Sequence, residues 1–181
     1  MSLDDLPYPP DPPVFFTVRL ADRRADTLVT HVDILRQAVR LARKSHPFEI
    51  RAAVVLPAVA HMIWALPRGD QEFAVRWRII KATFSRHVRV PQSADTASGP
   101  AFRSENAVWR RGYAAHPIRD QADYDKHAHL ILHAPVAAGL VRRPGDWALS
   151  SLHVRGAGPA PMFGPPPVGA GRMCSVDATL F

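Results

Sequence analysis

The sequence contains very little cysteine and very little lysine. Its 181 residues include one cysteine, Cys174, so neither an intrachain disulfide nor a zinc site made of several cysteines can form. Lysine occurs only at positions 44, 81 and 126, so arginine supplies most of the 23 basic residues. Because a planar guanidinium donates two parallel hydrogen bonds to a phosphate, this bias suits a phosphate-rich ligand.

The sequence also has no long apolar segment and fewer acidic than basic residues. No apolar run approaches the roughly 18 residues needed to cross a bilayer, and the N-terminal residues are acidic and rich in proline. We therefore expect a cytoplasmic protein, with association to the nucleoid as a further option. The 16 acidic residues leave a formal charge of +7. This charge favours a polyanionic partner such as DNA, with a merely basic protein as the alternative.

The chain is long enough for one hydrophobic core, and proline and glycine mark the ends of the predicted domain. Residues 1–13 carry several prolines, which disfavour a helix, and we expect an extended lead-in there. Residues 154–181 are rich in glycine and proline and are expected to form a flexible tail. The predicted domain is therefore 14–153, with a flexible loop at about 90–106, where Pro, Ser and Gly concentrate.

Hydrophobic periodicity within this domain predicts its secondary structure. Strands are expected where β-branched and aromatic residues concentrate, and helices where apolar residues recur every three or four positions. The predicted strands are 14–20, 48–57, 60–66 and 108–118, and the predicted helices are 31–45, 71–87 and 120–134, with Pro135 ending the last. This order is typical of an α+β protein whose antiparallel sheet carries helices on one face. We expect a ferredoxin-like arrangement.

Five stretches of the chain, taken in order, carry the pattern of one protein family. They are FFTVRLADRR at 15–24, RKSHPFEIRAAVVLPAVAHMIWALPRGD at 43–70, FAVRWRIIKATFSR at 73–86, VWRRGYAAHPIRDQADYDKH at 108–127 and APVAAGLVRRPGDWALSS at 134–151. Together these blocks resemble the REP-associated tyrosine transposases, a branch of the HUH single-strand nucleases, and five ordered blocks are far more specific than one short motif. The resemblance implies a ferredoxin-like homodimer that acts on hairpin-forming single-stranded DNA.

The resemblance also implies a reaction that this chain lacks the residues to perform. The family holds a divalent metal with two histidines flanking an apolar residue and with a helix asparagine, and a helix tyrosine attacks the phosphorus. In this chain Val59 stands at the first histidine, Leu130 at the tyrosine and Ala134 at the asparagine, whereas His61 retains the second histidine. Apolar side chains can neither coordinate nor attack. We expect a pseudoenzyme without a cofactor, using Mg²⁺ or Mn²⁺ only if the family activity persists.

Basic side chains on the second predicted helix and near the last predicted strand form the expected DNA-binding surface. The candidate phosphate contacts are Arg76, Arg78, Lys81, Arg86, Arg110, Arg111 and Arg119. Trp109 lies beside two of these arginines and is the candidate for stacking on an unpaired base. A solvated charged face is the alternative for the basic residues, and packing in the core is the alternative for Trp109.

Two further functions remain open besides DNA binding without cleavage. One is an active nuclease with a rebuilt site, in which His61 and the histidines at 127–133, namely His127 and the i, i+4 pair of His129 and His133, bind a metal. Tyr113 or Tyr124 would then replace the nucleophile, and the alternatives are histidines on a helix surface and tyrosines packed in the core. The other is a relic that folds and dimerises without a ligand.

Overall fold

The structure, a computed structural model, describes residues 12–88 and 108–151. The predicted loop at about 90–106 and the predicted tail 154–181 therefore lie outside the described residues. Residues 1–11 of the predicted lead-in also lie outside the described residues, which begin at Pro12. The domain bounds 14–153 remain a prediction.

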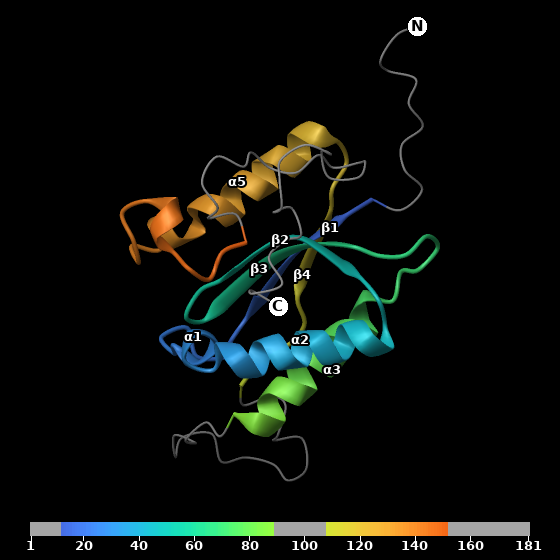
Figure 1. The fold of residues 1–181 in the computed structure, drawn as a ribbon, viewed down its shortest axis with the longest axis horizontal. Coiled ribbons are helices and arrows are strands. Elements are labelled where there is room, and N and C mark those ends of the chain that lie inside the picture. Colours follow the sequence, from blue (N-terminus) through green and yellow to red (C-terminus); the bar gives the residue numbers. More distant parts are fainter. Residues whose placement is uncertain (1–11, 89–107, 152–181) are drawn as a thin grey trace, which may run out of the picture.

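An antiparallel sheet lies at the centre of the described residues, with strand order β2-β3-β1-β4 (Figure 1). Its strands are β1 (Val14–Arg19), β2 (Glu49–Val55), β3 (Val59–Ala65) and β4 (Ala114–Pro117). One helical layer connects β1 to β2 and β3 to β4, which gives the β-α-β-β-α-β order of a ferredoxin-like fold. The predicted α+β class with an antiparallel sheet is confirmed.

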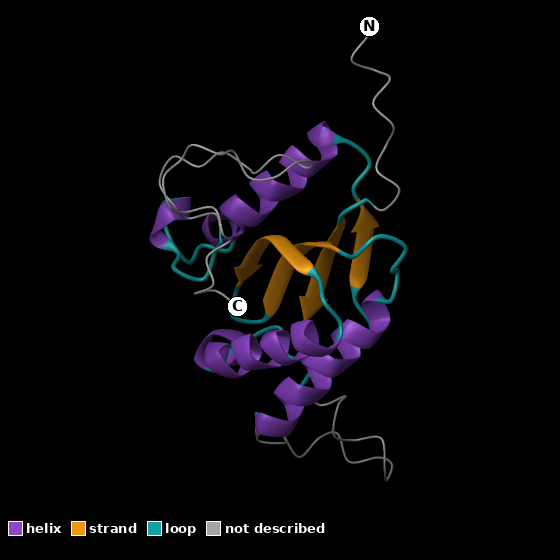
Figure 2. Ribbon diagram, turned by 45° about the vertical axis from the view of Figure 1, so that its right-hand side comes forward, coloured by secondary structure: helices purple, strands orange, loops and turns teal. Residues whose placement is uncertain are grey.

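Helices cover both faces of this sheet (Figure 2). The helices are α1 (Thr27–Thr30), α2 (Val32–Ser45), α3 (Phe73–His87) and α5 (Gln121–Ala137), followed by the 3₁₀ helix η3 (Pro144–Asp146). The prediction of helices on one face holds for α2 and α3, whereas α5 lies on the opposite face. None of the described helices is long and apolar enough to span a membrane.

The side-chain alternation of β1 explains why both faces are covered. Successive strand residues point to opposite faces, and β1 is apolar at consecutive positions. Phe16 packs with Trp64 and Trp77 beneath α2 and α3, where the two indole rings stack with their centroids 4.3 Å apart. Phe15 faces the other way and packs in the same cluster as Tyr124 of α5. Leaving either face open would expose large aromatic surfaces to water, at a cost of about 2 kcal/mol for each large side chain.

The C-terminal end of α5 extends beyond the predicted stop at Pro135. Proline lacks a backbone N–H and removes one helical hydrogen bond, yet α5 continues past Pro135 and ends at Ala137. Gly139 follows the C-cap residue with a φ of 70°, a conformation that suits glycine. The N–H of Leu140 donates to the carbonyl of Pro135 at 2.9 Å and closes the helix end.

The predicted strand 108–118 is much shorter in the structure. Only β4 belongs to the sheet, and Trp109 forms an isolated bridge with Leu20. Gly112 separates the two with a φ of 71°, a conformation that turns the chain out of an extended strand. Arg110 and Arg111 lie in the bend that this break creates, and both line the candidate site described below.

Candidate functional site

The residues at the positions that the resemblance assigns to catalysis lie on two elements. Val59 and His61 belong to β3, and Leu130 and Ala134 belong to α5. In the register of β1 with β3, His61 lies opposite Thr17 and Val59 lies opposite Arg19. Val59 and Ala134 of α5 both pack against the apolar cluster under this helix. Leu130, at the tyrosine position, is 41% exposed. Tertiary structure thus brings Val59 and Ala134 to the same apolar cluster, although they are far apart in sequence.

His61 is a neutral imidazole held within this face. The hydroxyl of Thr17 lies 2.8 Å from its Nδ1, and its ring stacks on Phe15 with centroids 5.7 Å apart. Burial, and next the positive charge of Arg19, lower the pKa of His61 from 6.5 to about 4. His61 is therefore uncharged near neutral pH.

The side chains at the family's metal positions do not fit Mg²⁺ or Mn²⁺. Val59 and Ala134 offer no donor atom, and His61 supplies nitrogen where magnesium prefers several oxygen ligands. The Nδ1 atom of His61 is also already engaged with the hydroxyl of Thr17. These three side chains therefore do not supply the set of metal ligands that the family resemblance implies.

Neither tyrosine considered as a replacement nucleophile is placed for that role. Tyr124 is 1% exposed in the cluster beneath α5, and burial raises the pKa of its phenol to about 12. Tyr113 packs edge-on against Phe16, which belongs to the core on the opposite face of the sheet. Tyr124 therefore has the core-packing role that was the alternative in the sequence, whereas Tyr113 is 36% exposed and contacts the core on the other side of the sheet only through its ring.

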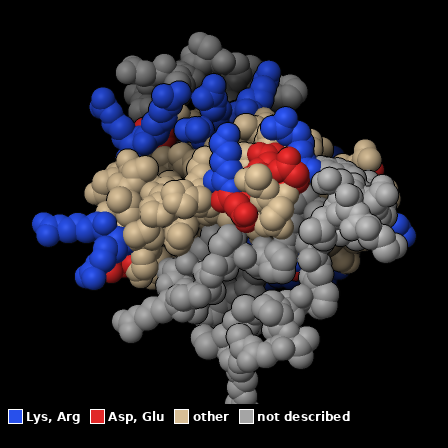
Figure 3. All heavy atoms as spheres, turned by 90° about the horizontal axis from the view of Figure 1, so that it is seen from above, with Lys and Arg blue, Asp and Glu red and all other residues tan. Residues whose placement is uncertain are grey.

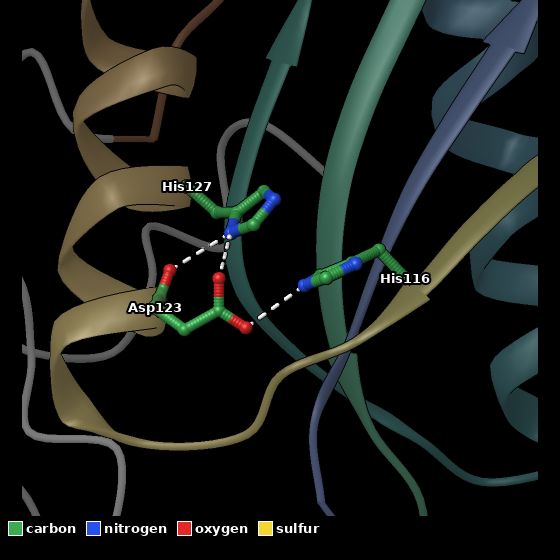
Figure 4. A group of neighbouring side chains, drawn as sticks. All are labelled: His116, Asp123 and His127. Carbon is green, nitrogen blue, oxygen red and sulfur yellow. Dashed lines mark hydrogen bonds and ion pairs between the residues drawn. The ribbon is translucent and has the colours of Figure 1, made fainter.

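The histidines of α5 form a different arrangement from the predicted metal site. The rings of His129 and His133 stack with centroids 4.1 Å apart, but His61 does not join them. In the described part of the chain, one group of three side chains could hold a metal ion, namely His116, Asp123 and His127 (Figure 4). Of the histidines in the predicted rebuilt site, His127 belongs to this group, whereas His61, His129 and His133 do not.

A basic hollow of about 410 Å³ opens on the surface where the end of β1 meets the bend after Val108. It is lined by Arg19, Leu20, Ala21, Arg23, Trp109, Arg110 and Arg111. The two segments are joined by a hydrogen bond from the N–H of Arg110 to the carbonyl of Arg19, at 2.9 Å. None of the four arginines has a carboxylate partner among residues 12–88 and 108–151. The basic hollow therefore offers guanidinium groups free to bind an anion.

Lys81 of α3 supports the wall of the basic hollow from beneath. Its ammonium donates to the carbonyls of Arg110 and Gly112 and lies 5.5 Å from the centre of the Trp109 ring. Burial lowers the pKa of Lys81. The side chain predicted to contact phosphate thus holds the backbone that presents the arginines.

Two predicted DNA contacts are corrected by their burial. Arg76 is 1% exposed and pairs with the carboxylate of Asp70, while its guanidinium also donates to three backbone carbonyls. Trp109 is 3% exposed and packs against Phe84, so neither face of its ring is free for a base. The sequence pattern placed Arg76 on the outer face of its helix, but Asp70 and the chain before β2 cover that position.

The remaining predicted DNA contacts lie at the surface. Arg78 and Arg86 are exposed on α3, and Arg119 is exposed at the start of α5. Arg19 and Arg23 are basic-hollow residues that the sequence prediction missed. Their sequence positions could have indicated them, because Arg19 ends the first predicted strand and Arg23 lies in the charged turn that follows.

The surface seen from the α5 side is strongly basic along one margin (Figure 3). Lys and Arg side chains gather there with few acidic side chains between them. A concentration of basic side chains of this kind attracts a polyanion to the part of the surface where it lies.

Comparison with known proteins agrees with the fold and the matched blocks. No model of a protein family matches the chain. The chain is 38% identical over 139 residues to the REP-associated tyrosine transposase of Escherichia coli strain K12, covering 77% of this chain and 75% of that protein. A solved structure of a REP-associated tyrosine transposase bound to a REP hairpin matches with a TM-score of 0.69 at 34% identity, covering 93% of each chain. With this identity and coverage, the chain belongs to the family of REP-associated tyrosine transposases.

Proposed function

We propose that this protein binds single-stranded or hairpin DNA through the basic hollow and has lost the tyrosine nuclease activity of its family. The observation that carries DNA binding is the set of four arginines around the hollow, without carboxylate partners in the described part of the chain. The solved relative bound to a REP hairpin supports the choice of ligand. The cytoplasm remains the predicted place of action.

Phosphate binding at the hollow follows from the chemistry of arginine. Each guanidinium can donate two parallel hydrogen bonds to phosphate oxygens and remains charged at every accessible pH. Neutralising about four phosphates of a single strand should give log affinity a slope near −3 against log salt concentration. A strong salt dependence is therefore part of the proposal.

Charge reversal in the hollow tests DNA binding. Binding of a labelled hairpin with a single-stranded tail is measured by fluorescence anisotropy for Arg23→Glu and Arg110→Glu. We expect each change to weaken binding at least about tenfold and to reduce the salt slope by about 0.7 for the lost contact. Arg68→Glu is the matched control, because Arg68 is exposed beyond the far end of β3. An equal loss in the control, or a slope near zero in the wild type, would contradict the proposed site.

The loss of nuclease activity rests on the apolar side chains at the family's catalytic positions. We expect no covalent adduct between wild-type protein and hairpin DNA on denaturing gels with Mg²⁺ or Mn²⁺. We expect the triple variant Val59→His, Leu130→Tyr, Ala134→Asn to form one, because it restores the side chains that the family resemblance implies and position 130 is 41% exposed. Val59→His, Ala134→Asn without the tyrosine is the control. An adduct formed by wild-type protein would overturn the proposal and support a rebuilt site.

The homodimer implied by the family resemblance is part of the same proposal. Light scattering after size-exclusion chromatography, with and without hairpin DNA, measures the mass of the complex. A dimer that binds DNA in a salt-dependent way fits the proposed function, whereas a dimer without DNA binding fits a relic that only folds and associates.

A further inference from the structure

β4 and the first turns of α5 bring three metal-ligating side chains together, as Figure 4 shows. His116 comes from β4, and Asp123 and His127 lie one turn apart on the inner side of α5. The i, i+4 spacing places the last two on one face of the helix. One ligand atom from each residue lies within 4.8 Å of the other two.

The carboxylate of Asp123 is the centre of this cluster. Its Oδ2 accepts a hydrogen bond from Nε2 of His116 at 2.8 Å, and its Oδ1 lies 3.2 Å from Nδ1 of His127. That Nδ1 also lies 2.8 Å from the backbone carbonyl of Asp123. The two imidazole rings stack with centroids 4.6 Å apart and an angle of 25° between their planes. Both rings therefore direct a nitrogen towards the same carboxylate.

The surroundings hold these side chains in position before any ligand arrives. Asp120 caps α5 by accepting a hydrogen bond from the N–H of Asp123 at 2.8 Å. The ring of Phe15 packs on His127 with centroids 4.6 Å apart. Burial alone would raise the pKa of Asp123, but hydrogen bonds from His116 and the N–H of Arg119 outweigh it and lower this pKa to about 2. The buried carboxylate is therefore ionised near neutral pH.

We propose that His116, Asp123 and His127 form a zinc site, with Nε2 of His116, a carboxylate oxygen of Asp123 and Nδ1 of His127 as ligands. Two imidazole nitrogens and one carboxylate oxygen are typical zinc ligands, with bonds of about 2.0 to 2.2 Å. Zinc replaces the hydrogen bonds to the carboxylate, so the proton on each binding nitrogen moves to the other ring nitrogen or to water. The side chain of His116 is 40% exposed, which gives the ion a route in and leaves a coordination position for water.

This site differs from the metal site implied by the family resemblance. It shares no residue with Val59, His61 or Ala134, and its nitrogen ligands suit zinc better than magnesium. The test of zinc binding does not depend on DNA binding through the basic hollow, because zinc binding is measured without DNA. Failure of one proposal therefore leaves the other standing.

Direct titration of the full-length protein, without an affinity tag and freed of metal with EDTA, tests the site. Zinc binding is followed by calorimetry, and cobalt serves as a spectroscopic probe because its visible absorption reports coordination geometry. We expect one zinc per chain and no competition from excess magnesium. Loss of an outer partner of a metal ligand costs about 10- to 100-fold in affinity, so Asp123→Asn and His116→Gln should each cost about 100-fold or more.

The control changes are His129→Gln and His133→Gln, because these histidines form the other i, i+4 arrangement on the same helix. Both should leave zinc affinity within about threefold of the wild type. His116→Gln keeps the test decisive if Asp123→Asn does not fold, since His116 lies partly exposed at the edge of the sheet. Absence of zinc binding to the wild type, or binding that follows His129 and His133 instead, would overturn the proposal.

Discussion

Lowering the pH from 7 to 4.5 is expected to destabilise this fold through His61. The folded protein holds the pKa of His61 at about 4, whereas the unfolded chain has the ordinary value of 6.5. Between these values the unfolded state binds more protons than the folded state, so stability falls as the pH falls. The physical cause is the cost of placing a charged imidazole in a buried position near Arg19.

The magnitude follows from the two pKa values of His61. Each pKa unit corresponds to about 1.36 kcal/mol, so the full difference is worth about 3.4 kcal/mol. At pH 4.5 most of this is lost, and the free energy of unfolding should fall by about 2.4 kcal/mol relative to pH 7. Asp123 does not contribute in this window, because its pKa of about 2 keeps the carboxylate ionised.

Urea unfolding of wild-type protein and His61→Gln at both pH values measures this effect. The amide of Gln can still accept a hydrogen bond from Thr17 but does not titrate. The wild type should lose about 2 kcal/mol more than the variant on acidification, while the remaining histidines cancel in the comparison. If both proteins lose the same stability, His61 does not carry the charge penalty and the reasoning fails.

The buried ion pair and the support of the basic hollow give two further predictions. Asp70→Asn leaves the charge of Arg76 buried without its partner and should lower the free energy of unfolding by about 3 kcal/mol. The same change at the exposed Asp33 should cost less than about 1 kcal/mol, and equal losses in urea unfolding would contradict a special role for the buried pair. Lys81→Met removes the ammonium that holds the Arg110 carbonyl and should weaken hairpin DNA binding about three- to tenfold, roughly the net worth of one ordinary hydrogen bond. Unchanged anisotropy titrations would show that the wall does not need this support.

Local sequence pattern was sufficient for the order of strands and helices. The alternation in the first strand and the three- and four-residue spacing in the first two long helices depend on neighbours in sequence, and these elements appear close to their predicted bounds. The proposal that catalytic side chains are replaced at Val59, Leu130 and Ala134 also rests on the sequence, because an apolar side chain cannot bind a metal or attack a phosphate in any fold.

Tertiary packing decided what this periodicity left open. Arg76 has the sequence environment of a surface arginine, yet Asp70 and three carbonyls enclose it. The position of α5 depends on Phe15, which needs a cover on the face away from α2 and α3.

Both candidate sites combine residues from separate elements. The basic hollow joins Arg19 of β1 to Arg110 beyond the bend, and the proposed zinc site joins His116 of β4 to Asp123 of α5. Sequence alone determined the order of the elements and which side chains are available along them, because both follow from local composition. The structure decided which retained groups meet, because that depends on how the sheet and helices bury their apolar faces.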